Sequence, residues 1–500
     1  MVEEQKPFDS ASDQEAATKK VASRHATRIL LVLVGVALLV NYVETMVIPG
    51  VPTIQKDLNT TTTLASWITS AYLIVGSAVS PLFGKLGDIY GKKRMFLISL
   101  VFYMAGVGLA GFAPTIYILI FARALQGMGF AIIPLALAII TDAFPRERVA
   151  TAQGVISGTF AIGATLGLII GSYVVQDLGW PYAFHTALIL SLILFALTAK
   201  VLEKDVVRAV SKAVDYAGAG ILIGGITLVL LYVTEGPTLG WLSSEELAML
   251  IPGAALMVFF FYFESKRSHP LMQLSLLRIR NVLVSNLVGL MSGIVMFLLF
   301  FAVTYYTQLP KPFGLNLTII AAGLTLGPST LAMLVGGPLA GRTLPRVGPK
   351  PLLLIGETLL GIGLVTLILN RSSSQIVSID MFITLLGTVT ILVPIVNMLA
   401  IALPRENIAV GLGMNTMLRN LGGAIGPVVA TTIMTTYVAP YYISVGGHQI
   451  LAAQLPTSGA FNLIFEVAIA MTILTVAISL ATKNYTFKKS APAAPPQEAP

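Results

Sequence analysis

The sequence predicts an all-α integral membrane protein with fourteen transmembrane helices, built as two pseudo-symmetric six-helix bundles plus an inserted helix pair. The first observation is composition. Hydrophobic residues make up 56% of the 500 residues and charged residues only 11%, whereas soluble chains average about 45–50% and about 25%. The second is a regular recurrence of long apolar runs, and the third is an internal repeat. This composition excludes a disordered chain, a coiled coil and an ordinary soluble enzyme.

Fourteen apolar runs separated by short polar breaks are the predicted spans. Their lengths suit the roughly 20 residues that cross a bilayer as a helix, and they lack the ten-residue alternation of a membrane β-barrel. The runs lie at about 29–48, 64–83, 95–113, 115–140, 152–174, 182–201, 214–233, 246–263, 281–307, 318–340, 351–369, 379–402, 408–436 and 460–482. Because the first 28 residues are polar, we expect the first span itself, and no cleavable signal peptide, to target the chain.

The basic residues predict the orientation of these spans. If the N-terminus is cytoplasmic, 26 of the 31 Lys and Arg residues fall in cytoplasmic segments. Only Lys56, Lys311 and Arg371 fall on the opposite side of the membrane, and the remaining two, Arg123 and Arg419, lie within spans. Positive residues favour the cytoplasmic side, so both termini are predicted there, in a multi-pass protein of the plasma membrane. The net charge of +8 then faces the anionic leaflet of the bilayer, which excludes a nucleic-acid partner.

Two stretches of the chain, 259 residues apart, carry a repeat. A Pro-Arg-Glu motif and three glycines recur in register: Pro145, Arg146, Glu147, Gly154, Gly163 and Gly167 match Pro404, Arg405, Glu406, Gly413, Gly422 and Gly426. A weaker pair consists of the basic, glycine-punctuated loops that begin at Gly84 and Gly336. The repeat equates spans 1–6 with spans 9–14 and leaves spans 7–8 as an insertion. Two parallel bundles are typical of transporters with a binding site at the bundle interface.

These observations predict the domain organisation. An N-terminal cytoplasmic tail covers 1–28, and the N-terminal bundle covers 29–203. The inserted pair with its flanking loops covers 204–278, and the C-terminal bundle covers 279–483. The Pro/Ala-rich tail at 484–500 is predicted to be disordered.

Four motifs carry a family resemblance. They are the loop Gly84-Lys-Leu-Gly-Asp88-Ile-Tyr-Gly91-Lys92-Lys93-Arg94, the span-4 run Arg123-Ala-Leu-Gln126-Gly127, the span-1 stretch from Glu44 to Leu58, and the span-13 run from Arg419 to Gly426. Together they resemble the signatures of the major facilitator superfamily, and the fourteen spans resemble its drug:proton antiporter branch. The chain departs from the branch at Leu168, where the span-5 motif has proline, and at Val43, where the span-1 acid usually stands.

The resemblance implies a secondary transporter that exports lipophilic or amphipathic compounds in exchange for protons by alternating access. Such a protein works as a monomer on small molecules and protons, with no cofactor, no metal and no enzymatic reaction. The alternative is the same fold moving a specific metabolite, peptide or lipid, in either direction. A membrane-bound lipid enzyme is less favoured, because we find no catalytic cluster and no nucleophile elbow in the sequence. A channel is less favoured, because the two-half repeat and the loop from Gly84 to Arg94 favour alternating access.

Two charged residues within spans are the predicted proton-coupling residues. A carboxyl group in a span costs about 2.5–3.5 kcal/mol, and Glu44 lies about fifteen residues into span 1. Arg123 lies about eight residues into span 4, keeps its charge and is expected to face the bundle. The alternatives are a solvated Glu44 at the outer end of its helix and an Arg123 that only bonds backbone carbonyls.

The remaining candidate residues form three groups. Those predicted to line a substrate cavity are Asn41, Gln126, Tyr305, Gln308, Asn415 and Arg419, with helix packing as the alternative for the last two. Those that the resemblance implies for a cytoplasmic latch are Gly84, Asp88, Gly91, Lys92, Lys93, Arg94 and Asp142, with Asp88 facing the start of span 13. Glycines predicted to bring helices close are Gly163, Gly167, Gly422 and Gly426. Glu357 and Glu466 are weaker candidates, expected near span ends within reach of water.

Overall fold

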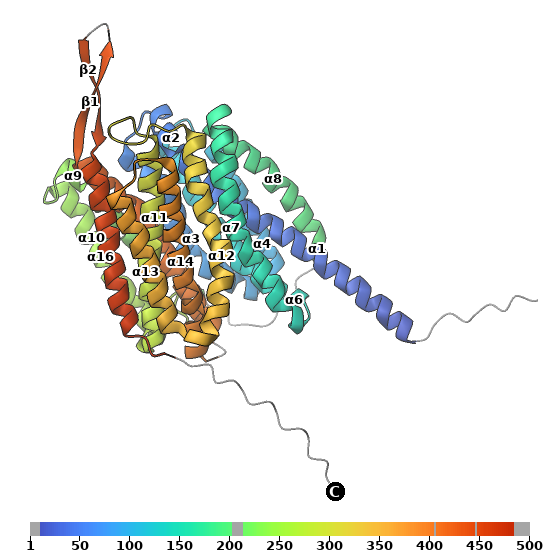
Figure 1. Cartoon of the computed structure of the whole chain (residues 1–500). Helices are drawn as coiled ribbons and strands as arrows, with labels where there is room; N and C mark the ends of the chain where they lie inside the picture. The colour runs from blue at the N-terminus through green and yellow to red at the C-terminus, as the bar shows by residue number, and fades with distance from the viewer. Residues whose placement is uncertain (1–10, 203–213, 405–406, 446–447, 485–500) are drawn as a thin grey trace, which may run out of the picture. The chain divides into compact units, whose positions relative to one another are not determined.

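The computed structural model describes residues 11–202, 214–404, 407–445 and 448–484. Within these ranges nearly every residue is helical, with one antiparallel β-hairpin (Figure 1). Thirteen helical segments there are long and apolar enough to cross a membrane, so the predicted all-α membrane fold is confirmed. Parts of the sequence predictions lie outside the described residues: 1–10 of the N-terminal tail, 203–213 at the junction of the N-terminal bundle and the inserted pair, Arg405 and Glu406 of the repeat, and 485–500 of the C-terminal tail.

The chain folds as two compact units. The first takes the chain up to Ile226 together with Thr318–Gly323, and the second takes Thr227–Leu317 and the chain from Leu324 onward. The helices of the first unit are α1 (Ala11–Met46), α2 (Val51–Asp57), α3 (Thr62–Tyr90), α4 (Lys92–Gly111), α5 (Ile116–Gly127), α6 (Ile132–Ala143), α7 (Arg146–Asp177) and α8 (Trp180–Val201), with the 3-10 turns η1 (Ile48–Gly50) and η2 (Met128–Ala131).

The second unit holds the rest of the described helices and the hairpin. Its elements are α10 (Ser244–Lys266), η3 (Leu274–Arg278), α11 (Arg280–Gln308), α13 (Pro349–Leu369), α14 (Ser374–Ala402), α15 (Ile408–Thr436), β1 (Val438–Val445), β2 (His448–Pro456) and α16 (Ser458–Leu480). Two further helices, α9 (Tyr216–Leu239) and α12 (Ile319–Val347), have residues in both units.

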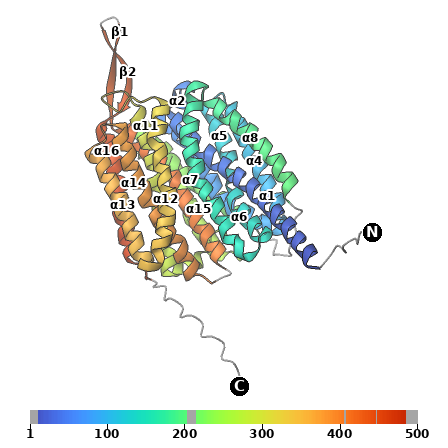
Figure 2. The same ribbon diagram turned by 45° about the vertical axis from the view of Figure 1, so that its right-hand side comes forward.

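Two elements depart from the sequence prediction. The first helix begins at Ala11, well before the predicted span, because the polar stretch up to Arg28 is rich in good helix formers. The loop predicted between spans 13 and 14 contains the β1–β2 hairpin. Its first strand is rich in aromatic and β-branched residues, which favour a strand. The hairpin stands clear of the helices of its own unit (Figures 1 and 2).

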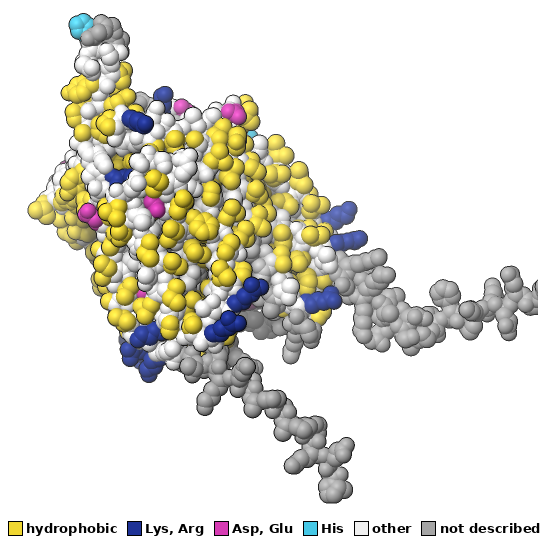
Figure 3. Space-filling view, in the orientation of Figure 1, with side chains coloured by type: hydrophobic (Ala, Val, Ile, Leu, Met, Phe, Trp, Pro, Cys, Tyr) yellow, Lys and Arg dark blue, Asp and Glu magenta, His cyan; other side chains and the backbone are white. Residues whose placement is uncertain are grey.

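The predicted span at 408–436 corresponds to α15, which is not among the thirteen helical segments that are long and apolar enough to cross a membrane. Asn415, Arg419 and Asn420 lower its apolar content. The outward faces of the helices carry many exposed hydrophobic side chains, among them Leu192, Val258 and Ile362 (Figure 3). Apolar residues exposed over whole helices suit contact with lipid rather than water.

The sequence repeat is also a repeat of helix packing. In the first unit Gly163 of α7 lies against the carbonyl oxygen of Leu38 on α1, at 2.8 Å from an ideal Cβ. In the second unit Gly422 of α15 lies against the carbonyl oxygen of Leu290 on α11. The next matched pair, Gly167 and Gly426, contacts α1 and α11 one turn further on. Each bundle therefore joins its first and fifth helices, backbone to backbone, through matched glycines.

A second glycine pair repeats the contact between the third and fourth helices. Gly106 of α4 lies 2.7 Å from the carbonyl oxygen of Ala122 on α5, and Gly363 of α13 lies 2.8 Å from that of Asp380 on α14, measured from ideal Cβ positions. These two contacts align α4 with α13 and α5 with α14, residue by residue.

Matched lysines tie the third helix of each bundle to the end of the sixth. Lys93, near the start of α4, donates hydrogen bonds from Nζ to the carbonyl oxygens of Ala199 and Leu202 at the end of α8, at 3.0 and 2.5 Å. Lys350, at the matching place in α13, donates to Leu480 at the end of α16 at 2.7 Å. A cation at a helix C-terminus is favourable. We call the end of each unit at which this lysine lies its basic end.

Alanine at a packed glycine tests the repeat. A Cβ added at Gly426 would lie 2.5 Å from the carbonyl oxygen of Ile294, so Gly426→Ala should destabilise the protein by about 1–3 kcal/mol and lower its melting temperature in detergent. Gly413→Ala, on the same helix, is the control, because a Cβ there meets nothing within 4 Å. Equal melting of the two variants would contradict the close packing of α15 on α11.

Candidate functional site

A buried arginine forms the polar centre of the first unit. Arg123, on α5, is only 1% exposed. Its Nε donates a hydrogen bond to the carbonyl oxygen of Ile68 at 2.9 Å, and its Nη1 donates one to Oε1 of Gln126 at 2.7 Å. The guanidinium lies 4.4 Å from the ring centroid of Tyr72, which is a cation–π contact. Because a guanidinium stays charged, these groups hold a permanent positive charge inside the unit.

Glu44, on α1, places a carboxyl group in the same region. Its side chain is 9% exposed, and it is close enough for its charge to act on Arg123, Tyr72 and Tyr103. An acid and a permanent cation therefore share one buried region of the first unit.

Two other predicted residues of the first unit are hydrogen bonded within it. Asn41 is 5% exposed and donates from Nδ2 to the carbonyl oxygen of Ala37 at 2.7 Å and to Oγ1 of Thr159, on α7, at 3.5 Å. Gln126 is fully buried and holds Arg123. Asn41 thus adds a polar contact to the close packing of α1 on α7, and Gln126 belongs to the arginine cluster.

Sequence reasoning missed two tyrosines of this cluster, Tyr72 and Tyr103. Both are fully buried. The Tyr103 hydroxyl donates a long hydrogen bond, 3.5 Å, to the carbonyl oxygen of Leu39. A tyrosine within a span carries a hydroxyl that needs a partner, and this signal was available, but only the fold shows that the Tyr72 ring contacts Arg123 and that Tyr103 lies in the same region.

The charged pair belongs to the first unit alone. The glycine contacts that align α11 with α1 place Met296 at the position of Glu44, and those that align α14 with α5 place Met381 at the position of Arg123. Both positions accept an uncharged side chain in the second unit. The repeated architecture therefore does not require the charges.

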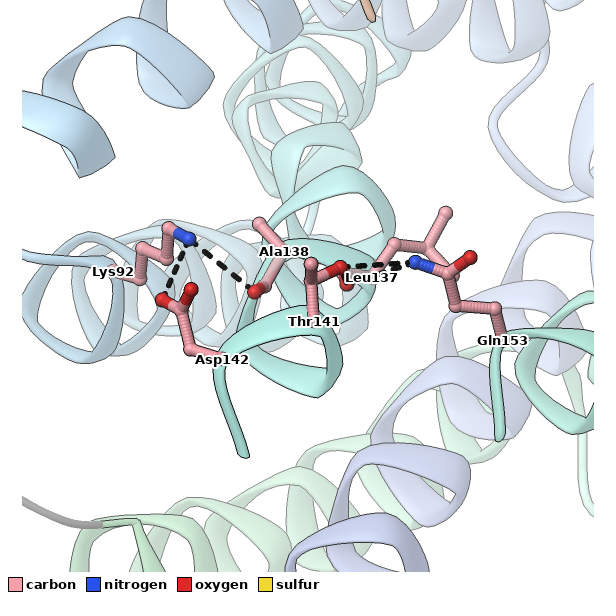
Figure 4. A network of polar contacts seen from close by, with 6 residues as sticks. All are labelled: Lys92, Leu137, Ala138, Thr141, Asp142 and Gln153. Carbon is pink, nitrogen blue, oxygen red and sulfur yellow. Dashed lines mark hydrogen bonds and ion pairs between the residues drawn. The ribbon is translucent and has the colours of Figure 1, made fainter. Parts of the chain in front are cut away.

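The predicted latch contains an ion pair at the basic end of the first unit. Lys92 Nζ lies 2.6 Å from Oδ2 of Asp142 and donates to the carbonyl oxygen of Ala138 at 3.3 Å (Figure 4). Beside it, Gln153 Nε2 on α7 donates to Oγ1 of Thr141 at 3.1 Å. The ion pair thus joins the start of α4 to the end of α6, and Asp142 is 53% exposed.

The other latch residues surround the turn between α3 and α4. Gly91 has a φ of 104°, a conformation that favours glycine, and so permits the sharp change of direction. Gly84 has open space around its Cβ position. Asp88 and Arg94 are exposed. The approach of Asp88 to span 13 stays a prediction.

The remaining cavity candidates lie in the second unit. Asn415 is 6% exposed and donates from Nδ2 to the carbonyl oxygen of Ser285, on α11, at 2.7 Å. The carbonyl oxygen of Arg419, on α15, lies against Gly293 of α11. Tyr305 is buried, with its ring centroid 5.0 Å from that of Phe301, and Gln308 is half-buried. Asn415 joins two helices, whereas no described contact assigns a cavity to the others.

Arg371, a cation predicted outside the spans, is buried at the end of the second unit opposite its basic end. It donates from Nη2 to Oγ of Ser458 at 2.6 Å and from Nη1 to the carbonyl oxygen of Leu367 at 3.1 Å. Its guanidinium lies 5.1 Å from the ring centroid of Tyr306. Burial lowers the pKa of Arg371 from its ordinary value, but a guanidinium remains charged near neutral pH.

Comparison with protein families decides the identity of the fold. Residues 33–427 match the family model of the Major Facilitator Superfamily. The chain belongs to the Major Facilitator Superfamily. This superfamily member is therefore a multi-pass membrane protein, as its thirteen apolar helical segments also require.

Several curated proteins are similar to this superfamily member over most of their length. Multidrug resistance protein Stp of Mycobacterium tuberculosis is 27% identical over 82% of this chain and 76% of its own. Multidrug transporter protein MdtP of Bacillus subtilis is 26% identical over 78% and 72%. The tetracenomycin C resistance and export protein of Streptomyces glaucescens is 26% identical over 83% and 77%.

Solved structures of the superfamily share the fold. The xylose transporter XylE from E. coli matches with a TM-score of 0.60 at 12% identity, covering 93% of this chain and all of that one. The nucleoside transporter NupG matches with a TM-score of 0.61 at 12% identity, covering 91% and 100%. At this identity the similarity establishes the architecture and not the cargo.

Substitution of Tyr72 tests how Arg123 is held. Tyr72→Leu removes a cation–π contact worth up to about 2 kcal/mol when desolvated and should lower the melting temperature of the purified protein. Tyr72→Phe keeps the ring. It also removes a buried hydroxyl that has no hydrogen-bond partner among the described residues, so it should melt at or above the wild-type temperature. A larger loss in Tyr72→Phe than in Tyr72→Leu would show that the ring does not hold Arg123.

The Lys92–Asp142 pair should be weak enough to break during a conformational change. Exposed ion pairs contribute about 0–1 kcal/mol and weaken in salt. A double-mutant cycle of Lys92→Ala and Asp142→Ala, read by unfolding at low and high salt, should give a coupling energy in this range that falls with salt. A salt-independent coupling of several kcal/mol would mean a rigid structural contact.

Proposed function

We propose that this protein is a secondary active transporter that exports lipophilic or amphipathic compounds in exchange for protons, by alternating access. The names of its relatives support efflux, because three of them, at 26–27% identity, are named a multidrug resistance protein, a multidrug transporter and a tetracenomycin C resistance and export protein. The observation that carries the proton part is the buried Glu44 beside Arg123. An ionisable group held within a membrane span is by default a functional group.

The chemistry of the pair supports coupling. With Glu44 ionised, its charge and that of Arg123 nearly cancel inside the first unit. With Glu44 protonated, a net positive charge remains, and it favours a conformation in which the region is better solvated. Moving one net charge across 100 mV is worth roughly 2.3 kcal/mol, so proton entry can drive export without ATP.

The uncharged residues at the matching positions of the second unit also support proton coupling by the first unit. Met296 and Met381 occupy the places of Glu44 and Arg123. Proton exchange at this site therefore changes the electrostatics of one bundle and not of its repeat.

We also propose that the basic ends of both units face the cytoplasm and that the protein lies in the cell membrane with both termini inside. Lys92, Lys93 and Lys350 gather at these ends, and basic residues favour the cytoplasmic side. In this orientation the Lys92–Asp142 pair lies on the cytoplasmic side, where it would open and close with the transport cycle.

The second candidate is the same fold carrying a specific metabolite, peptide or lipid. The solved neighbours include a xylose transporter, a nucleoside transporter and a peptide transporter, and a fold does not define a cargo. Competition between a lipophilic cation such as ethidium and an organic acid such as benzoate would separate the two candidates. Inhibition by benzoate and not by other lipophilic cations would favour the specific carrier.

The coupling is tested in proteoliposomes with an imposed pH gradient and ethidium as substrate. Glu44→Gln removes the ionisable group and should abolish gradient-driven accumulation, a loss of at least about tenfold, while ethidium binding persists. Glu466→Gln is the matched control, because Glu466 is an exposed carboxyl on α16 and should leave transport unchanged. Wild-type coupling in Glu44→Gln would contradict the proposed role of Glu44.

A further inference from the structure

The second unit contains a buried carboxyl group that the proposed mechanism does not use. Glu357, on α13, is 1% exposed, so it does not reach water as its place in the sequence suggested. Ser479, near the end of α16, donates from Oγ to Oε1 of Glu357 at 2.5 Å. Oε2 has no hydrogen-bond partner among the described residues. One hydroxyl is thus the whole hydrogen-bonding environment that the structure describes for this acid.

No basic side chain of the described residues forms an ion pair with Glu357. Within the unit, α13 packs against α14 and α16. The acid of α14, Asp380, lies beside Gly363, nearly two turns from Glu357, and Glu466 of α16 is exposed. The nearest lysine of α13, Lys350, directs its Nζ to the carbonyl oxygen of Leu480.

A carboxylate in these surroundings would be an uncompensated buried charge. Burying an ionised group without a partner is far more costly than burying the neutral acid. A single hydroxyl donor compensates only a small part of that cost. The Glu357 carboxyl is therefore protonated in the conformation that the structure describes.

The internal repeat shows that the fold does not need an acid at this place. Gly91, Lys93 and Gly106 of the first bundle match Gly348, Lys350 and Gly363 of the second at one constant spacing, through the contacts described above. The same spacing pairs Glu357 with Leu100, which is fully buried in α4. A leucine thus fills this position in the other bundle, and the acid has another purpose.

Polar groups connect this acid to the basic end of the second unit. Ser479 is one turn from Thr482, whose Oγ1 is buried without a partner in the described part of the chain. Asn281 of α11 pairs with the backbone of Lys483, donating from Nδ2 to its carbonyl oxygen at 3.0 Å and accepting from its amide nitrogen at 2.9 Å. Polar groups therefore follow one another along the chain from Ser479 to Lys483, between Glu357 and the basic end of the unit.

We propose that Glu357, held by Ser479, is a second proton-binding site of the transport cycle. In the release step the O–H bond of the carboxylic acid breaks and the proton passes to water at the basic end, leaving a carboxylate that the Ser479 hydroxyl stabilises. Reloading reverses the step, and no other reactant takes part. The proposal rests on the proposed function only in assuming that the transporter is proton coupled.

Infrared difference spectroscopy of the full-length protein in lipid nanodiscs tests the protonation directly. A step to higher pH should remove a carbonyl band of a protonated carboxylic acid from the wild-type protein. The band should be absent from Glu357→Gln, present in the control Glu466→Gln, and shifted in Ser479→Ala, which removes the hydroxyl donor. A wild-type protein with no such band, or with a band that neither pH nor ethidium changes, would overturn the proposal.

Two functional measurements separate a proton site from a structural acid. In proteoliposomes, Glu357→Gln should lower the number of protons taken up per ethidium exported, whereas Glu466→Gln should not change it. Glu357→Leu, which copies Leu100, should melt at or above the wild-type temperature because it removes a buried polar group. A lowered melting temperature in Glu357→Leu with an unchanged proton count in Glu357→Gln would overturn the proposal.

The outcomes also separate this proposal from that for Glu44. Coupling that survives Glu44→Gln and changes in Glu357→Gln would contradict the role of Glu44 and support that of Glu357. A pH-sensitive band from Glu357 would support its proton binding even if ethidium were not the cargo. A pH-insensitive band with intact export in Glu357→Gln would overturn the second site and leave the proposed function standing.

Discussion

Direct backbone contact between the first and fifth helices of each bundle is the constraint on which the rest of the structure depends. Apolar side chains gain little by leaving lipid for a protein interior, so membrane helices associate through close packing and polar contacts. Gly163 and Gly167 provide that approach in the first unit, and Gly422 and Gly426 provide it in the second. Once these pairs are set, the places of Glu44 and Asn415 within their units follow.

A repeated scaffold carries different polar groups in its two halves. The first unit buries Glu44 and Arg123 where the second has methionines, and the second buries Glu357 where the first has leucine. The glycines and the helix-capping lysines are common to both halves because they build the fold. The buried ionisable groups differ because each bundle is free to add them wherever an apolar residue would also fit.

Hydropathy and spacing predicted the spans and the repeat, because lipid requires long apolar helices and close packing requires glycine. Glu44 and Arg123 stood out because charge is rare inside spans. The β1–β2 hairpin was missed because a strand is not expected in the connection between two membrane helices, although the aromatic and β-branched residues of β1 favour one. Tyr72, Tyr103 and the burial of Glu357 depend on which face of each helix meets a neighbour, and helices apolar on every side carry no such signal.

The hairpin also changes how its two flanking helices are connected. The amide of Thr457 donates to the carbonyl oxygen of Tyr437 at 3.0 Å, and the strands pair from Val438 with Pro456 outward. The long connection between α15 and α16 thus behaves as a tight turn, because the paired residues at the base of the hairpin hold its two ends together and so offset the entropy cost of closing the loop. A peptide tag inserted far from that base would lengthen the loop at little cost in stability.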